Sequence, residues 1–331
     1  MSPQLVASLI FLAGLIGLVW SAHYFVGGSA SLAKHLGMTP GLIGLTVVAF
    51  GTSAPEILVA GSAALEGAPD LGVGNAIGSN IANIGLVLGA TALVAKLPVS
   101  HWLMRLEVPL LVIATALAAW ILFDHQLSRT EGLVLLGVAA LLPLALLLDL
   151  KYHKVARDED IYPVDEDEIP DLPLGKSIIW LCGGLMILLL SADLLVGAAT
   201  ALANFFGVSP MIIGLTVVAL GTSLPELAAS IASAVKGHHE MAVGNIIGSN
   251  VLNILLVMAI PAIIMPTALD PQVFTRDALT MMALTLILLA LIFFKTSRGQ
   301  AGKGYIGRSA ACLLLLIYIG YYAVLFTGSK L

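Results

Sequence analysis

The sequence predicts an all-α polytopic membrane protein, with ten transmembrane helices arranged as two inverted five-helix repeats. Of its 331 residues, 59% are hydrophobic and only 11% are charged, and the mean hydropathy is +1.02. Ten apolar runs reach or approach the roughly 20 residues that span a bilayer. A block of sequence also occurs twice, 170 positions apart. Because lipid offers no hydrogen-bond partners to the backbone, we expect all ten spans to be helices.

The ten runs form two sets of five. The first set lies near 4–27, 41–65, 71–95, 105–123 and 130–149, and the second near 174–197, 209–235, 241–266, 274–294 and 306–327. We therefore divide the chain into a first repeat (1–150), an acidic cytoplasmic linker (151–173) and a second repeat (174–331). Like charges repel, so the linker is expected to be solvated and extended. It lacks the glycine turn and ligand spacing of an EF-hand loop.

The basic residues predict the orientation. Three of the fifteen Lys and Arg residues fall on the side that includes the termini, namely Arg129, Arg276 and Lys330, and the other twelve fall on the opposite side. Basic connections stay in the cytoplasm, so both termini are expected to be periplasmic. An odd number of helices per repeat inverts the second copy, and inverted repeats place a binding site near the bilayer midplane. The short loops and compact size indicate a bacterial inner membrane protein.

The duplicated block carries one acid in each copy. Residues 43–53 read IGLTVVAFGTS and residues 213–223 read IGLTVVALGTS, and the copies continue to Pro55-Glu56 and Pro225-Glu226. A proline inside a helix leaves the carbonyl four residues earlier without its donor. Oxygens freed there would join the hydroxyls that precede the glutamates, which belong to Thr52, Ser53, Thr222 and Ser223. Each copy therefore predicts a broken helix with oxygen ligands around a carboxylate.

A charge at mid-bilayer costs roughly 3 kcal/mol on insertion scales, so Glu56 and Glu226 need compensation. The facing spans contain no Lys or Arg, which leaves metal cations or protonation. Two carboxylates match one divalent ion, and calcium accepts carboxylate, carbonyl and hydroxyl oxygens. Sodium accepts the same oxygens. No His or Cys lies near either motif, which disfavours zinc and copper.

The following helices supply a second duplicated motif, Gly-Asn-x-Ile-Gly-Ser-Asn-x-x-Asn, at 74–83 and 244–253. Ser79 and Asn83 are four residues apart and share one helix face, and Ser249 and Asn253 mirror them. Their oxygens also suit hard cations. Four glycines are expected to allow close helix packing, namely Gly74, Gly78, Gly244 and Gly248. Four further asparagines fit either ligand binding or hydrogen bonding between helices, namely Asn75, Asn80, Asn245 and Asn250.

Polar residues outside the two motifs have simpler interpretations. Cys182 and Cys312 are expected to be small buried residues within apolar runs. His238 and His239 are expected to be exposed in a short cytoplasmic turn. Three further predictions concern helix ends: an ion pair between Arg105 and Glu107, another between Arg276 and Asp277, and interfacial positions for His23 and its repeat mate Asp193.

At these motifs the chain resembles the calcium/sodium exchanger family of the cation/calcium antiporter superfamily, bacterial type, over nearly its whole length. The resemblance implies that Glu56 and Glu226 are the central calcium ligands. It implies further calcium and sodium ligands at Thr52, Ser53, Thr222, Ser223, Ser79, Ser249, Asn83 and the carbonyls of Ala49 and Ala219. Some relatives carry aspartate at the position of Asn253, so the asparagine argues against potassium co-transport.

The sequence thus predicts a secondary antiporter that exchanges sodium for calcium by alternating access and normally extrudes calcium. A proton-coupled calcium antiporter is the alternative, since a buried glutamate can exchange a metal for protons. A channel or an intramembrane enzyme fits less well, because the apolar runs leave no continuous polar pore and no His-Glu-x-x-His motif is present. No cofactor is expected. The expected partners are calcium, sodium and the bilayer. A net charge of −5 argues against nucleic acid, and no obligatory protein partner is evident.

Overall fold

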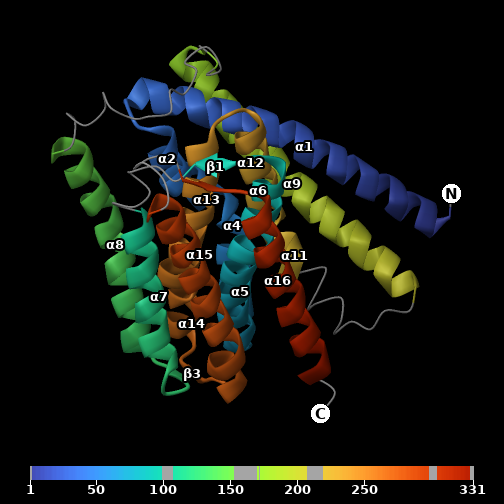
Figure 1. The fold of residues 1–331 in the computed structure, drawn as a ribbon. Helices are drawn as coiled ribbons and strands as arrows, with labels where there is room; N and C mark the ends of the chain where they lie inside the picture. The colour runs from blue at the N-terminus through green and yellow to red at the C-terminus, as the bar shows by residue number, and fades with distance from the viewer. Residues whose placement is uncertain are drawn as a thin grey trace.

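The computed structural model describes residues 2–98, 107–152, 170, 172–206, 219–297 and 304–328, which are almost entirely helical (Figure 1). The first half contains α1 (Pro3–Leu36), α2 (Pro40–Ile43), η1 (Gly44–Val48), α3 (Ala49–Thr52), α4 (Ala54–Leu65), α5 (Pro69–Ala82), η2 (Asn83–Leu88), α6 (Gly89–Val94), β1 (Leu97–Pro98), α7 (Val108–Leu122), β2 (Gln126–Leu127) and α8 (Arg129–Tyr152). The second contains α9 (Leu174–Phe205), α11 (Ala219–Thr222), α12 (Leu224–Val235), α13 (His239–Leu252), η7 (Asn253–Val257), α14 (Ala259–Ile264), β3 (Thr267–Ala268), η8 (Val273–Ala278), α15 (Leu279–Ser297), β4 (Tyr305–Ile306) and α16 (Arg308–Gly328). The η segments are π-helical.

Within the described ranges, six helical stretches are long and apolar enough to cross a membrane. They are Pro3–Leu36, Pro69–Val94, Leu174–Ala199, His239–Ile264, Val273–Phe293 and Arg308–Leu325. The pair Gly41–Thr52 and Ala54–Leu65, bent by 42°, makes seven if it is one broken span. The chain is therefore a multi-pass membrane protein. Most of the predicted linker, and the first residues of the predicted spans 105–123 and 209–235, lie outside the described residues.

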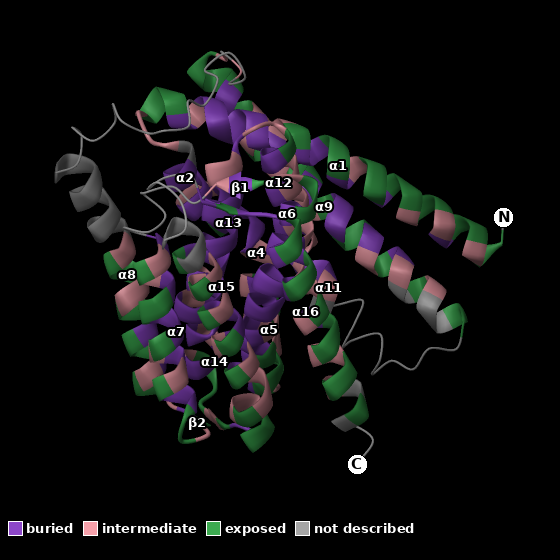
Figure 2. Ribbon diagram, viewed as in Figure 1, coloured by how far each residue is buried: buried purple, intermediate pink, exposed green. Residues whose placement is uncertain are grey.

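The bundle has a buried centre and an exposed periphery (Figure 2). The stretches α5–η2–α6 and α13–η7–α14 are mostly buried, whereas α1 and α9 are much less buried and the first half of α1 is mainly exposed. Many of their exposed side chains are large and apolar; Ile16 on α1 and Ile179 on α9 are each 69% exposed. Apolar faces this extensive are not stable in water, and they are the surfaces expected to meet lipid. The central position of the two duplicated motifs keeps them away from that lipid.

Helices α1 and α9 lie side by side along the outside of the bundle, where small residues let their backbones approach (Figure 1). A Cβ at Gly28 would come within 2.5 Å of the Leu181 nitrogen, and one at Gly184 within 2.5 Å of the Phe25 nitrogen. Ser31 and Ser177 add a hydrogen bond of 2.8 Å between their hydroxyl oxygens. Close packing of small residues is a usual way for helices to associate in lipid, where burial of apolar surface gives no driving force.

Two short antiparallel pairings join the two halves of the chain. Strand β1 pairs with β4, so that Leu97 lies opposite Ile306, and β2 pairs with β3, so that Leu127 lies opposite Thr267. Both pairings connect a segment of the first half to a segment of the second. Each half is therefore tied to the other at two places besides the helical core.

Two predictions about single residues are wrong. Cys182 and Cys312 are exposed rather than buried, since each lies on the outer face of an apolar helix. His238 is 1% exposed, because the turn after α12 folds back so that the His238 N–H bonds Ser233 O at 2.9 Å, and His239, also expected to be exposed, is half-buried. Burial lowers the pKa of His238 to about 4, so its ring is neutral. The predicted ion pair of Arg276 with Asp277 is confirmed at 2.6 Å, whereas Arg105 lies outside the described residues.

Gly184 offers a test of the α1–α9 packing. We expect Gly184→Ala to lower the melting temperature of the purified protein by several degrees, because overpacking against backbone costs typically 1–3 kcal/mol. The matched control is Gly183→Ala, since a Cβ at Gly183 would meet no described atom within 4 Å. Equal melting temperatures for the two variants would contradict the packing described here.

Candidate functional site

Two helix breaks place the predicted glutamates. Ser53 (φ −80°, ψ 7°) separates α3 from α4, and Ser223 (φ −88°, ψ 2°) separates α11 from α12 in nearly the same conformation. Pro55 and Pro225 then occupy the first turn of α4 and α12, where a missing N–H costs no helical bond. The same first turns carry Glu56 and Glu226. Each break therefore directs a carboxylate from a helix N-terminus into the bundle.

The two carboxylates are fully buried and accept hydrogen bonds from side-chain hydroxyls. Ser53 Oγ, from the opposite half of the chain, donates to Glu226 Oε1 at 3.2 Å. The Thr222 side chain, also from the opposite half, lies close to the Glu56 carboxylate. Ser79 Oγ, from α5, donates to Glu56 Oε1 at 3.5 Å. The structure thus brings Ser53, Ser79 and the two glutamates into one site, whereas among the described residues Asn83, Ser249 and Asn253 make no side-chain hydrogen bond to either carboxylate.

Two asparagines fix the glutamate backbones. Asn75 Nδ2 donates to Glu56 O, and Asn245 Nδ2 donates to Glu226 O, both at 3.4 Å. Asn245 also accepts from Thr52 Oγ1 at 3.2 Å and donates to Ser230 Oγ at 2.9 Å. These asparagines therefore position the site through hydrogen bonds between helices, an interpretation that the sequence left open. Ser230 was not predicted, because its repeat mate is Ala60 and the comparison of the copies gave no signal.

The two predicted carbonyl positions differ in their surroundings. Ala49 O accepts from Ser53 N at 3.0 Å and from Thr52 Oγ1 at 3.3 Å. In the second copy, Ser223 N donates instead to Leu220 O at 3.2 Å, one residue after Ala219. The two breaks are therefore similar in backbone conformation but not identical in hydrogen bonding.

Several buried polar atoms at the site have no hydrogen-bond partner among the described residues. They are Oε2 of Glu56 and Glu226, the amide atoms of Asn83, Asn250 and Asn253, and the hydroxyls of Ser223 and Ser249. Each such group costs about 1–3 kcal/mol when left unpaired in a buried position. A hard cation needs six to eight oxygens, and carboxylate, amide and hydroxyl oxygens are its usual ligands. Unpartnered oxygens of these kinds are the ligands that a hard cation would satisfy.

Asn83 and Asn253 both begin a π-helical segment, η2 and η7. The Met258 N–H bonds Asn253 O at 3.0 Å, five residues back, which marks the wider turn. Such single π turns occur frequently at functional sites, because the extra residue changes the direction of nearby side chains. By contrast Asn80, one turn earlier than Asn83, uses its amide within its own helix and donates to Ala76 O at 2.8 Å.

The Glu56 and Glu226 carboxylates lie near enough for their charges to interact. Two like charges at short range in a low-dielectric interior repel strongly unless a cation lies between them. Among the described residues, no group of three or more His, Cys, Asp or Glu side chains could hold a metal ion. The negative charge at this site therefore comes from two carboxylates, and the hydroxyls that donate to them are neutral.

The comparisons with known proteins agree with this arrangement. The profile of the family described as "Sodium/calcium exchanger protein" matches residues 6–147 and 176–327. The chain belongs to the sodium/calcium exchanger family. Its members are transporters rather than enzymes, and the family supports cation/calcium antiport as the general class of activity.

Individual relatives of this exchanger cover nearly the whole chain. The putative antiporter CaxA of Alkalimonas amylolytica is 44% identical over 325 residues, which is 98% of this chain and 100% of the relative. The inner membrane protein YrbG of Escherichia coli is 40% identical, over 80% of this chain and 81% of the relative. A solved structure of the sodium-calcium exchanger NCX_Mj, soaked with sodium and strontium, matches with a TM-score of 0.78 at 32% identity. It covers 96% of this chain and 98% of that chain.

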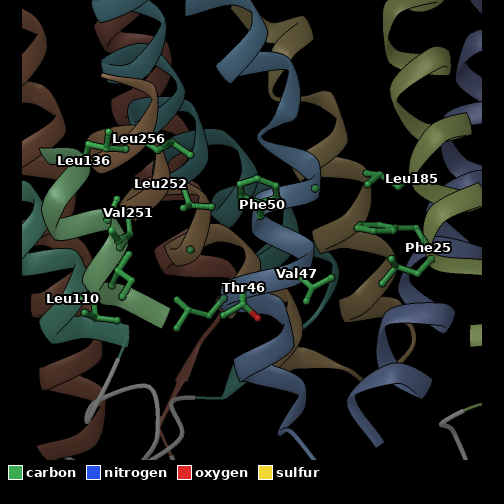
Figure 3. A pocket seen from close by; sticks show the side chains of 17 residues that line it. Phe25, Thr46, Val47, Phe50, Leu110, Leu136, Leu185, Val251, Leu252 and Leu256 are labelled. Atoms are coloured by element: carbon green, nitrogen blue, oxygen red, sulfur yellow. The ribbon is translucent and has the colours of Figure 1, made fainter. Parts of the chain in front are cut away.

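The exchanger also contains an apolar cavity of about 610 Å³ that is distinct from the carboxylate site. Figure 3 shows Phe50 on α3 between Leu136, Val251 and Leu256 on one side and Phe25 and Leu185 on the other. Thr46 is the one polar side chain in its lining, and its hydroxyl is bonded to Leu42 O at 2.7 Å. A cavity lined this way offers no ligand for a bare cation. It is therefore not the ion site.

Asn253 allows the ligand geometry to be tested by stability rather than by transport. We expect Asn253→Leu to leave the melting temperature without ions unchanged or higher, because the amide makes no hydrogen bond. The rise in melting temperature on adding calcium should fall, since binding at 100 times Kd stabilises by about 2.7 kcal/mol only while the site is intact.

The control for this experiment is Asn80→Leu, which removes a real hydrogen bond to Ala76 O. It should lower the melting temperature without ions and keep the calcium-dependent rise. If Asn253→Leu instead behaved like this control, Asn253 would be a structural residue and not a ligand.

Proposed function

We propose that the chain is a secondary active antiporter that exchanges sodium for calcium and normally extrudes calcium from the cytoplasm. The observation that carries this proposal is the pair of fully buried carboxylates, Glu56 and Glu226, surrounded by unpartnered neutral oxygens. A formal charge of −2 balances one calcium ion, and it can also be balanced by sodium ions that use the same oxygens. Family membership supports the same two ions.

In this proposal Glu56 and Glu226 are shared between the two cargo ions. The remaining ligands complete the calcium and sodium sites. They are Thr52, Ser53, Ser79, Asn83 and the Ala49 carbonyl from the first half, with Thr222, Ser223, Ser249, Asn253 and the Ala219 carbonyl from the second. The cross-bonding of Ser53 to Glu226 supports a joint site rather than two separate ones.

The electrostatics explain why such a site would exchange rather than leak. Calcium and sodium compete for the same two carboxylates, so the site cannot be fully occupied by both. An empty site would leave two like charges uncompensated while the protein changes conformation, which low-dielectric surroundings make costly. Reorientation is therefore favoured only when cations are bound, and the release of one ion type on each side requires binding of the other.

Alternating access would be carried by α1 and α9. These two helices pack mainly on each other and lie outside the buried centre, so they can slide over it while the site stays in place (Figures 1 and 2). In the proposed topology, ten helices form two inverted repeats of five, the segments 1–150 and 174–331 are these repeats, and 151–173 is a cytoplasmic linker. Both termini would be periplasmic, in the inner membrane that the name of the Escherichia coli relative states for that protein.

A proton-coupled calcium antiporter is the second candidate. It is favoured by one observation, that Oε2 of each buried glutamate has no partner among the described residues. A proton bound there would remove the charge as a sodium ion does. The two candidates predict different driving ions, and a measurement of calcium flux under sodium and pH gradients distinguishes them.

Calcium uptake into proteoliposomes tests the proposal. We expect an outward sodium gradient to drive calcium accumulation in the purified protein, and a pH or potassium gradient to fail. Glu56→Gln and Glu226→Gln should each reduce this flux to background, because removal of one carboxylate removes the charge that calcium requires.

Glu131→Gln is the matched control. Glu131 lies at the start of α8 and accepts from Ser128 at 2.7 Å, and glutamine serves equally well at such a helix N-terminus. This variant should transport at the normal rate. Undiminished flux in either Glu56→Gln or Glu226→Gln would exclude the assigned site, and flux driven by protons alone would favour the second candidate.

A further inference from the structure

Lys236 connects the core of the bundle to α1. It is the C-cap residue of α12, and its Nζ donates to the main-chain oxygen of His23 in α1 at 2.5 Å. Gly27, one turn further along α1, lies beside the same amine: a Cβ there would be in van der Waals contact with Nζ, at 3.4 Å. The lysine thus connects the end of α12 to a main-chain carbonyl within α1. We call this contact the Lys236 latch.

The latch lies on the helix that also carries the ion site. Glu226 is in the first turn of α12 and Lys236 is at its other end, about 15 Å away at 1.5 Å per residue. Burial lowers the pKa of Lys236 to about 8, so at neutral pH the amine is still mainly protonated and donates a charge-assisted hydrogen bond. A displacement of α1 past α12 must break this bond.

The repeat mates of the latch residues are of the opposite chemical kind. Positions 170 residues away hold Glu66 in place of Lys236 and Asp193 in place of His23. The backbone at the two helix ends is the same: Glu66 caps α4 with φ −82° and ψ 1°, and Lys236 caps α12 with φ −84° and ψ 10°. The difference therefore lies in the side chains and not in the fold.

The mirror contact is also not made in this structure. Helix α1 packs along α12, whereas among the described residues α9 makes no comparable contact with α4. Glu66 and Asp193 are both exposed, and a Cβ at Gly197, the mate of Gly27, would meet no described atom within 4 Å. The described structure is thus asymmetric, closed between α1 and α12 and open between α9 and α4.

In an inverted-repeat transporter, the opposite access state arises when the two halves exchange conformations. The contact of α1 with α12 would then be replaced by a contact of α9 with α4. Glu66 cannot form the mirror latch, because an ionised carboxylate only accepts hydrogen bonds and so does a carbonyl oxygen. The nearby Asp193 carboxylate would repel it as well. The chain can therefore latch only one of its two states.

We propose that Lys236 is a positioning residue that holds α1 on α12 and biases the protein toward the state closed at the Lys236 end. This inference rests on the alternating access of the proposed function. With the orientation proposed above, the closed end is cytoplasmic and the favoured state is open to the outside. Removal of the latch should shift the equilibrium between the two access states toward the state that is open at the Lys236 end. A mirror latch built at Glu66 should shift it in the same direction.

Spin-label distances test this without any transport. Labels at Val19→Cys on α1 and Val94→Cys on α6, both exposed positions, would report how α1 sits on the core in a chain that also carries Cys182→Ser and Cys312→Ser. Two label distances are expected, one for each access state. We expect Lys236→Met to raise the population at the second distance, relative to the population at the first, about tenfold, equivalent to about 1.4 kcal/mol. Glu66→Lys, which supplies the missing donor, should shift the ratio in the same direction.

Two further variants should give the same distance distribution as the parent chain. Lys236→Arg keeps a charged donor, and Lys96→Met removes a lysine that lies over the Tyr305 ring instead of α1. An unchanged distance distribution in Lys236→Met would overturn the proposal. If that variant did not fold, an unchanged distribution in Glu66→Lys, whose site is exposed, would overturn it instead.

Transport from each side gives a second readout that a merely structural defect would not produce. The apparent affinity for an ion scales with the fraction of the state that can bind it. Lys236→Met should therefore lower the calcium KM at the Lys236 face and raise it at the opposite face, whereas a folding defect would lower the rate at both. Shifted distances in a chain without sodium-driven calcium flux would uphold the latch and refute the proposed function. Normal sodium-driven calcium flux without shifted distances would support the proposed function and refute the latch.

Discussion

The repulsion between two carboxylates in a membrane bundle is the constraint on which this structure depends. Glu56 and Glu226 are both fully buried, and each has one oxygen without a partner. No arrangement of apolar side chains relieves such a pair, because the cost comes from charges held in a low dielectric. The surrounding features, namely the helix breaks, the hydroxyls and the asparagines, all supply oxygens or hold the two glutamates in place. The charge of the pair must therefore be compensated by a bound cation or by protonation.

Much of this site could be predicted from the sequence, because duplication repeats its chemistry. The same Gly-Thr-Ser-x-Pro-Glu block in two copies gave the breaks and the carboxylates, and the spacing of Ser79 and Asn83 gave one helix face. The sequence could not reveal which hydroxyl bonds which acid. Ser53 bonds the glutamate 173 residues away and not the one three residues away. Pairing across the bundle depends on helix packing, which no local pattern contains.

Other features escaped prediction for different reasons. Hydropathy does not distinguish a side chain that faces lipid from one that faces the core, so the two cysteines were expected inside although they are exposed. A π turn adds a residue without changing composition, so η2 and η7 were not foreseen. His238 lies in a turn, where exposure is the usual expectation, but the turn folds back on α12 and buries the ring. In each case the information lies in the relative placement of elements and not in their residue types.

The short strand pairings have an evolutionary consequence. Strands β1 and β2 each pair with a strand of the second half, just as Glu226 accepts a hydrogen bond from Ser53 of the first half. Each half thus takes part of its hydrogen bonding from the other. In the proposed inverted-repeat topology, a single ancestral copy would have needed a twin inserted in the opposite direction, and fusion of the two genes would have made that association permanent. Once fused, the copies were free to diverge, and residues such as Lys236 and Glu66 could become different at positions that had once been identical.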